Sequence, residues 1–258
     1  MSWASRRRTA YAGAVIIIFA AIVFIPVYKF LSRPATCADG IQNQGETAID
    51  KGGPCPILDE RLLSDATVLW ARSFKVRDGS YSTVAYIENP NPSAGARNVE
   101  YTIGLYDSQN ILITEWSGTT SIMPGAVTPV FESGFDTGKR DVARTYMELS
   151  PDVIWEKMGN PATVVQIGNK KLSGTDRMPR LEATVENTST RTISDAGFVA
   201  VLFSPAGNAR AASRTELASI KPGMPQEIVF TWPEPFVGTV GRIDILPLME
   251  PMSGENTP

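Results

Sequence analysis

"NVEYTIGLYD", residues 98–107, decides the fold class, because apolar side chains alternate along it with polar or small ones. Four apolar residues fall on one face of this stretch: Val99, Tyr101, Ile103 and Leu105. Alternation with a period of two is typical of a β-strand that packs one face against a core. Similar stretches, bounded by Gly, Pro, Asn and Asp, follow one another through residues 66–248. We therefore predict an all-β fold for this part of the chain.

Short segments of the first half recur in the second half at nearly constant spacing, which indicates an internal repeat. The matched pairs lie 97 to 99 residues apart: IENPN (87–91) with VENTS (185–189), IGLYDSQN (103–110) with AVLFSPAGN (200–208), SIMPG (121–125) with SIKPG (219–223), and PVFES (129–133) with IVFTW (228–232). Copies of about 90 residues with frequent turn signals have the size of an immunoglobulin-like β-sandwich. We predict two such domains in tandem, at 66–150 and 162–248, with a linker at 151–161 and a disordered tail at 249–258.

The repeat predicts that paired positions have equivalent surroundings. Three pairs are expected to match: Tyr101 with Phe198 and Leu105 with Leu202 in the two cores, and Asn89 with Asn187 in a turn where each bonds nearby backbone. The large aromatic residues Trp70, Trp116, Trp155 and Trp232 are expected to anchor a core or a domain junction rather than to form a ligand platform.

The N-terminal part has the composition of a membrane span. Residues 9–30 are mostly apolar with no charge before Lys29, and Ala10–Tyr28 is long enough to cross a bilayer. Because Arg6–Arg8 precede this run, the positive-inside rule places residues 1–8 in the cytoplasm and the remainder outside. A cleaved signal peptide is the alternative, but its apolar region is usually shorter and no A-x-A-like site follows. We therefore expect a single-pass protein with an uncleaved signal anchor.

Two cysteines, Cys37 and Cys55, lie in the segment predicted to link the span to the sandwiches, residues 31–65. Thiols on the exported side of a membrane are normally oxidised, and closing a loop of this length contributes about 3 kcal/mol in the chain-entropy model. We expect a disulfide between them, with two free thiols as the alternative. A redox role is not indicated, because the C-x-x-C spacing is missing.

The same segment holds oxygen-bearing side chains that could bind calcium: Asp39, Asn43, Glu46 and Asp50. Calcium prefers carboxylate and amide oxygens, but the spacing of these residues does not match an EF-hand loop. The alternative is a polar, glycine-rich loop whose acidic side chains face water. Ca²⁺ is the one cofactor that the sequence suggests, and both alternatives are kept at this point.

Charge and composition limit the possible functions. Residues 1–33 contain five basic and no acidic residues, which leaves 19 basic against 27 acidic residues in the remainder. An acidic exported part argues against nucleic acid as a partner. The chain has no histidine, so Ser–His–Asp and Cys–His catalysis is excluded, and no phosphate-binding or nucleophile motif occurs. We expect no enzymatic activity, although a pair of carboxylates converging in space would leave no such motif.

Two resemblances add to this interpretation. The pattern C-x-DGI-x-N-x-x-E-x-x-x-D-x-GG-x-C, from Cys37 to Cys55, resembles a short Cys-rich module of bacterial surface proteins, with Lys51 where that module has a further cysteine. The loss of further cysteines would leave Cys37 and Cys55 as a pair. The order of Asn89, Leu105-Tyr106-Asp107 and a later Pro-Gly resembles the FxLYD-type domain of bacterial exported proteins, with Ile103 in place of the phenylalanine. The whole layout is similar to uncharacterised single-pass bacterial envelope proteins, and this similarity implies a fold but no catalytic residues.

From these features we expect a membrane-anchored, extracytoplasmic module of the bacterial cell envelope that binds or supports another envelope protein or surface component. The alternative is a scaffold or assembly subunit of a membrane complex that acts partly through its transmembrane helix. Small residues in the span, such as Ala12 and Gly13, would permit close helix packing. The sequence does not choose between periplasm and cell exterior.

Overall fold

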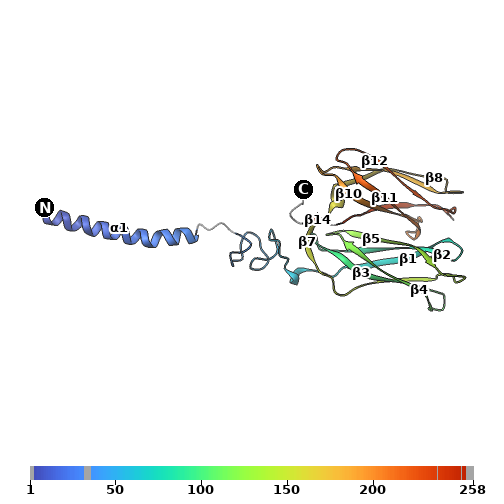
Figure 1. The fold of residues 1–258 in the computed structure, drawn as a ribbon, viewed down its shortest axis with the longest axis horizontal. Helices are drawn as coiled ribbons and strands as arrows, with labels where there is room; N and C mark the ends of the chain where they lie inside the picture. Colours follow the sequence, from blue (N-terminus) through green and yellow to red (C-terminus); the bar gives the residue numbers. More distant parts are fainter. Residues whose placement is uncertain (1–2, 32–35, 237, 251, 254–258) are drawn as a thin grey trace. The chain divides into compact units, whose positions relative to one another are not determined.

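The computed structural model describes residues 3–31, 36–236, 238–250 and 252–253 (Figure 1). The chain divides into two compact units, Met1–Pro56 and Ile57–Pro258, which are described separately. The first unit contains helix α1 (Trp3–Leu31) and a disulfide-closed segment. The second unit is built from antiparallel sheets, which confirms the all-β prediction.

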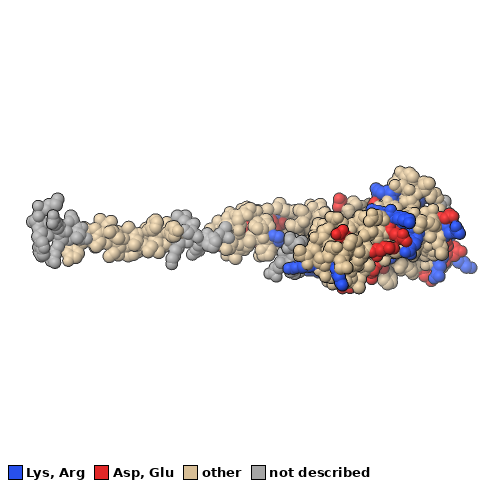
Figure 2. Space-filling model, turned by 90° about the horizontal axis from the view of Figure 1, so that it is seen from above, with Lys and Arg blue, Asp and Glu red and all other residues tan. Residues whose placement is uncertain are grey.

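Helix α1 is long and apolar enough to cross a membrane over Tyr11–Tyr28. This composition fits either a membrane anchor or a signal sequence. Pro26 lies inside the helix and does not end it. In Figure 2 the span Tyr11–Tyr28 shows no charged side chain, whereas the visible face of the sandwich unit carries basic and acidic residues interspersed.

The first sandwich packs the sheet β1-β2-β5 against a second sheet in which β3 lies between β4 and β6. A short 3-10 helix, η1 (Glu60–Leu62), precedes it and is capped by Asp59, whose side chain accepts a hydrogen bond from the backbone N–H of Arg61. The turn Arg77-Asp78-Gly79 joins β1 and β2 into a hairpin, and the register runs from Thr67 opposite Glu88 to Arg77 opposite Ser80. The strands are β1 (Thr67–Arg77), β2 (Ser80–Glu88), β3 (Ala94–Tyr106), β4 (Leu112–Ile122), β5 (Val127–Asp136) and β6 (Arg144–Leu149).

The second sandwich repeats this topology. Its sheets are β8-β9-β12 and β11-β10-β13, so each strand occupies the place of a strand in the first sandwich. The 3-10 helix η2 (Pro161–Val164) leads into it. The strands are β8 (Val165–Ser173), β9 (Arg180–Asn187), β10 (Ile193–Phe203), β11 (Ala209–Ile220), β12 (Gln226–Thr231) and β13 (Arg242–Leu248).

The paired residues have matching surroundings in the two sandwiches. Tyr101 and Phe198 are both buried, as are Leu105 and Leu202. Asn89 Nδ2 donates to the carbonyls of Ala94 and Met123, and Asn187 Nδ2 donates to those of Arg191 and Ile220. Each asparagine also accepts a hydrogen bond from the backbone N–H two residues later, at Asn91 and Ser189. The asparagines therefore fix the same turn in both sandwiches.

A hydrophobic interface joins the two sandwiches. Val84 and Tyr86 on the outer face of β2 meet Val199, Val201 and Phe203 on the outer face of β10. Every residue from Tyr81 to Ile87 is buried, because β2 contacts the core of its own sandwich on one face and the interface on the other. A strand that is covered on both faces carries a continuous apolar run. The sheets therefore stack in four layers, with β1-β2-β5 and β11-β10-β13 in the middle.

Aromatic residues strengthen this interface. The rings of Trp70 and Tyr86 lie 4.4 Å apart, and Trp70 approaches Phe203 of the other sandwich at 6.0 Å in an edge-on arrangement. A direct polar contact also crosses the junction, since Arg72 Nη1 donates to the Ala209 carbonyl at 3.1 Å.

The four predicted tryptophan anchors do not all share one environment. Trp70 serves the sandwich junction, Trp232 lies in the second core, and Trp155 packs against the first. Trp116 departs from the prediction: its side chain is 52% exposed, because β4 is an edge strand and the ring extends beyond the core.

The structure also departs from the predicted linker and tail. Residues 151–161 contain strand β7 (Glu156–Gly159), which pairs with Ala94 and Gly95 of β3. In the predicted tail, Met249 is buried, and β14 (Met252–Ser253) pairs with β7. These segments lack a long alternating pattern, but Trp155 packs against the core of the first sandwich and Met249 lies in the core of the second. Residues 251 and 254–258 of the tail lie outside the described residues.

Candidate binding cleft

The disulfide predicted from the sequence is present. Cys37 and Cys55 are bonded, with their Cα atoms 5.4 Å apart, and Cys55 is fully buried. Inside the loop that this bond closes, several turns place glycines at positive φ, including Gly45 and Gly53. A side chain at Gly53 would collide with the Gly45 carbonyl at 2.3 Å, so the loop folds back closely on itself.

The predicted calcium ligands mainly organise this loop. Asp39 accepts hydrogen bonds from Asn43 Nδ2 and from the backbone N–H groups of Thr36 and Ile41. The Asn43 amide, followed by those two backbone groups, holds the pKa of Asp39 below its usual value. Because the carboxylate already has these donors, it stabilises the turn without a metal.

Asp50 and Glu46 bind backbone amides in the same way. Asp50 accepts from the N–H groups of Asp39 and Gly40, and Glu46 Oε2 accepts from those of Asn43 and Asp50. The other Glu46 oxygen, Oε1, lies 3.1 Å from Cys55 Sγ. These contacts tie the two ends of the loop together across the disulfide.

Within the described residues, the predicted ligands Asp39, Glu46 and Asp50 do not bring their carboxylate oxygens together as one compact group. Among the described residues, the acidic and cysteine side chains that share one small volume are Cys37, Glu46 and Cys55, and both sulfurs belong to the disulfide. The buried Asn43 Oδ1 has no hydrogen-bond partner in the described part of the chain. The calcium interpretation therefore stays a prediction, and the loop has an alternative explanation in its own hydrogen bonds.

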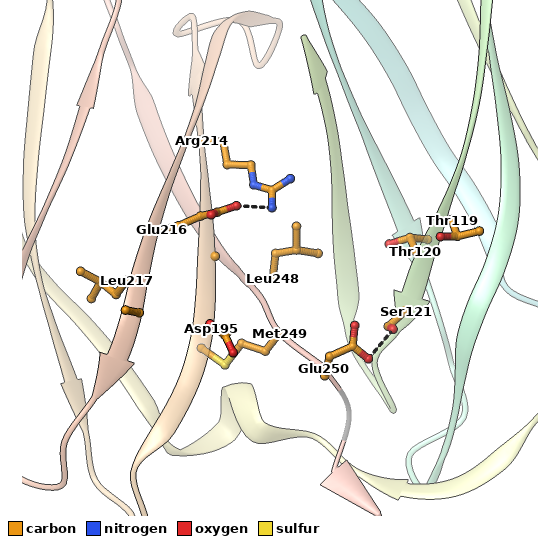
Figure 3. Close-up of a pocket in the computed structure, with 12 residues that line it drawn as sticks. Thr119, Thr120, Ser121, Asp195, Arg214, Glu216, Leu217, Leu248, Met249 and Glu250 are labelled. Carbon is orange, nitrogen blue, oxygen red and sulfur yellow. Dashed lines mark hydrogen bonds and ion pairs between the residues drawn. The ribbon is translucent and has the colours of Figure 1, made fainter.

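A cleft of about 520 Å³ opens between the two sandwiches, at the end of their hydrophobic interface (Figure 3). Strand β4 forms one side of the cleft, while β10, β11 and the end of β13 form the other. Its lining is Thr119, Thr120, Ser121, Asp195, Gly197, Arg214, Glu216, Leu217, Ala218, Leu248, Met249 and Glu250. This volume is within the usual range for a ligand pocket.

Gly197 explains why the interface opens at this point. It shares the outer face of β10 with Val199, Val201 and Phe203, which fill the interface. Gly197 lies opposite Glu216 of β11 and Leu248 of β13, and a Cβ there would lie 3.1 Å from the Leu248 carbonyl. The apolar contact between the sandwiches therefore stops at Val199. Beyond it, Gly197 contributes no side chain to fill the space between the sandwiches, and the cleft begins there.

The opposite wall of the cleft is the free edge of β4. Strand β4 is the last strand of its sheet, so within the described residues it pairs with β3 alone. Three consecutive residues of β4, Thr119 to Ser121, line the cleft. Since successive side chains of a strand point to opposite faces, a strand lines a cavity with consecutive residues only when it presents its edge.

Acidic groups dominate the electrostatics of the cleft. Glu216 forms an ion pair with Arg214, and Ser121 Oγ donates to Glu250 Oε2 at 3.0 Å. The third carboxylate belongs to the exposed Asp195, whose φ of 52° lies in the left-handed region that aspartate tolerates. The lining therefore holds three carboxylates and one guanidinium.

A buried tyrosine supports the β4 wall from the core side. The hydroxyl of Tyr101 donates to Glu132, and burial, followed by this carboxylate, raises the pKa of Tyr101. Tyr101 crosses β4 at Gly118, where a Cβ would lie 2.6 Å from the tyrosine oxygen. The absence of a side chain at Gly118 thus leaves room for the Tyr101 ring to extend past β4 and reach Glu132.

Sequence reasoning did not identify the cleft. Its residues come from four separate segments, and none of them forms a motif with its neighbours. The glycine at 197, inside the apolar run AGFVAVLF (196–203), is the one local irregularity that sequence inspection could have noted.

Comparison with known proteins adds no assignment. The chain matches no family model and no curated protein sequence. Among solved structures, it is similar to a red sea bream transglutaminase, with 7% identity and a TM-score of 0.24, over 72% of this chain and 30% of that one. It is also similar to a Bacteroides uniformis β-glucuronidase, with 12% identity and a TM-score of 0.18, over 67% of this chain and 22% of that one. The chain thus spans less than a third of either protein, and likenesses at this level carry no argument about function.

Proposed function

We propose that this protein is a membrane-anchored, extracytoplasmic binding module of the bacterial cell envelope, without catalytic activity of its own. Helix α1 would be its anchor, with the N-terminus in the cytoplasm. The sandwich pair would meet another envelope protein or a surface component outside the cytoplasm.

The observation that carries the proposal is the cleft at the end of the sandwich interface. Two sandwiches that share a buried apolar interface hold its walls at a fixed separation, and a preformed polar cleft loses little entropy when a ligand is bound. The disulfide supports an exported location, because such bonds persist in oxidising compartments. The resemblance to FxLYD-type exported proteins supports the same compartment.

Binding is favoured over catalysis by the nature of the cleft side chains. Its carboxylates contact an arginine and a serine hydroxyl, and the side chains that line it include no cysteine or lysine. Ser121 and Glu250 form a hydroxyl–carboxylate pair, but in the described residues no third group orients this carboxylate as a base would need.

Two measurements test the proposal. A protease added to spheroplasts should digest the sandwich unit, and protection of that unit would contradict the topology. Crosslinking in intact cells, with a photoreactive residue at Thr119 of the cleft, should capture an envelope partner. The matched control carries the photoreactive residue at Glu186, on the second sandwich and outside the cleft lining.

Exchanging α1 for an unrelated membrane anchor separates this function from a scaffold role. A binding module should keep its crosslinked partner after the exchange. Loss of the partner would favour the alternative, in which the protein assembles a membrane complex partly through its transmembrane helix.

A further inference from the structure

Strand β4 offers a hydrogen-bonding edge that other proteins usually protect. The sequence of this strand, LITEWSGTTSI (112–122), contains neither lysine nor proline, and its one charged residue is Glu115. Charged side chains, prolines and covering loops are the usual means of preventing another strand from adding to an edge. At Thr119–Ser121 this edge faces a cleft rather than open solvent.

The acidic side of the cleft faces that edge. Asp195 and Glu216 lie on the second sandwich, opposite β4, while Glu250 reaches Ser121 on β4 itself (Figure 3). A basic side chain entering here would meet these carboxylates, and Arg214 is already paired with Glu216. Leu248 provides apolar surface beside them, which suits the methylene stem of a lysine or arginine.

We propose that the cleft binds an extended segment of a partner polypeptide that adds to β4 as a further strand. Backbone hydrogen bonds to Thr119–Ser121 would hold the segment, and one lysine or arginine side chain would lie among Asp195, Glu216 and Glu250. This inference rests on the proposed function as a binding module and names the chemistry of its ligand. Strand addition supplies affinity through the main chain, and the charged pocket supplies specificity.

A divalent cation is a poorer occupant of this cleft. Metal binding would require the carboxylate oxygens to converge, and in the described residues Asp195, Glu216 and Glu250 do not form such a group. Carboxylates that are spread along a groove suit a long cationic side chain, because its charge can be shared among them without close coordination.

The test uses the full-length chain in lipid nanodiscs and short acetylated peptides of alternating threonine and valine with one central lysine. Fluorescence anisotropy should show saturable binding that weakens as salt is added, since exposed charges are screened. A peptide with norleucine in place of lysine should bind more weakly, and one with alternate backbone amides methylated should lose binding. Equal binding of all three peptides, or no binding of the lysine peptide at millimolar concentration, would overturn the inference.

Protein variants give an independent readout. Asp195→Asn and Glu250→Gln should each weaken binding of the lysine peptide roughly two- to fivefold, the size expected for one exposed ion pair. The matched control is Glu115→Gln, which removes a carboxylate from the same strand outside the cleft and should leave binding unchanged. An equal effect of all three variants would show a general charge effect and refute the site.

The inference and the proposed function can fail separately. If crosslinking from Thr119 captures an envelope partner but no lysine peptide binds, the strand-addition model is wrong and the binding module remains. If n-butylamine displaces the peptide at equal concentration, the cleft recognises the amine alone and strand addition is refuted.

Discussion

Replacing Asn187 by alanine should lower the free energy of unfolding by about 3 kcal/mol, a large effect for one polar residue. Asn187 is fully buried and holds the turn after β9 through its side-chain amide. The cost should arise from the backbone groups that lose their partner, and not from lost apolar contact.

The magnitude follows from the hydrogen bonds. Asn187 Nδ2 donates to the Ile220 carbonyl at 2.9 Å, and Oδ1 accepts from the Ser189 N–H at 3.0 Å. Alanine would remove both partners. The buried Ile220 carbonyl left without one costs about 1–3 kcal/mol, and the part-buried Ser189 N–H adds to this cost. The Arg191 carbonyl loses the amide donor at 2.7 Å but keeps the Ser189 hydroxyl at 3.0 Å, so it should add little.

Urea unfolding of the full-length protein in detergent, followed by tryptophan fluorescence, would measure this difference. Asn208→Ala is the control, because Asn208 is exposed, and it should change stability by less than about 0.5 kcal/mol. Asn89→Ala should cost at least as much as Asn187→Ala, since its amide bonds two buried carbonyls in the same manner. A loss below about 1 kcal/mol for both buried asparagines would refute the reasoning.

Three further predictions concern other parts of the chain. Cys37→Ser should loosen the loop that ends at Cys55 by about 3 kcal/mol, seen as faster proteolysis within that loop and unchanged unfolding of the sandwiches; an unchanged cleavage rate would contradict it. The lowered pKa of Asp39 means that its stabilising effect is present above its unfolded pKa, about 3.9, and is lost as pH falls through the lower folded value. The protection of loop amides against hydrogen exchange, corrected for the intrinsic exchange rate at each pH, should therefore fall below about pH 4, and Asp39→Asn should remove that dependence. Gly118→Ala should destabilise the first sandwich by about 1–3 kcal/mol through overpacking against Tyr101, and an equal cost in a background carrying Tyr101→Phe would show that the tyrosine oxygen is not the obstacle.

The sequence allowed the sandwiches to be predicted because their strands carry local signals. Alternation at 98–107 and the recurring asparagine turns depend on neighbours within a few residues, so they are visible without a structure. The pairing of the loop cysteines was also predicted correctly, because two thiols in one short segment predicted to be exported have few alternatives to bonding each other.

The contact between the sandwiches was not predicted, although the sequence contained a signal for it. Residues 81–87 and 198–203 are apolar or uncharged without interruption, which indicates strands covered on both faces. The cleft had no comparable signal, because its walls are brought together only by that contact. Strand β7 was missed since a strand of four residues is too short for a pattern to establish a period.

Gly197 has an evolutionary consequence. The two sandwiches would be in contact along this whole face if residue 197 carried a side chain, and the cleft is the part that the glycine leaves open. A single mutation at this codon could therefore close or reshape the cleft while β2 and β10 stayed packed elsewhere. Homologous chains that conserve the sandwich pair but vary at this position would be expected to differ in what they bind. Under the proposed binding function, position 197 is therefore where selection on ligand recognition can act with little change to the packing between the two sandwiches.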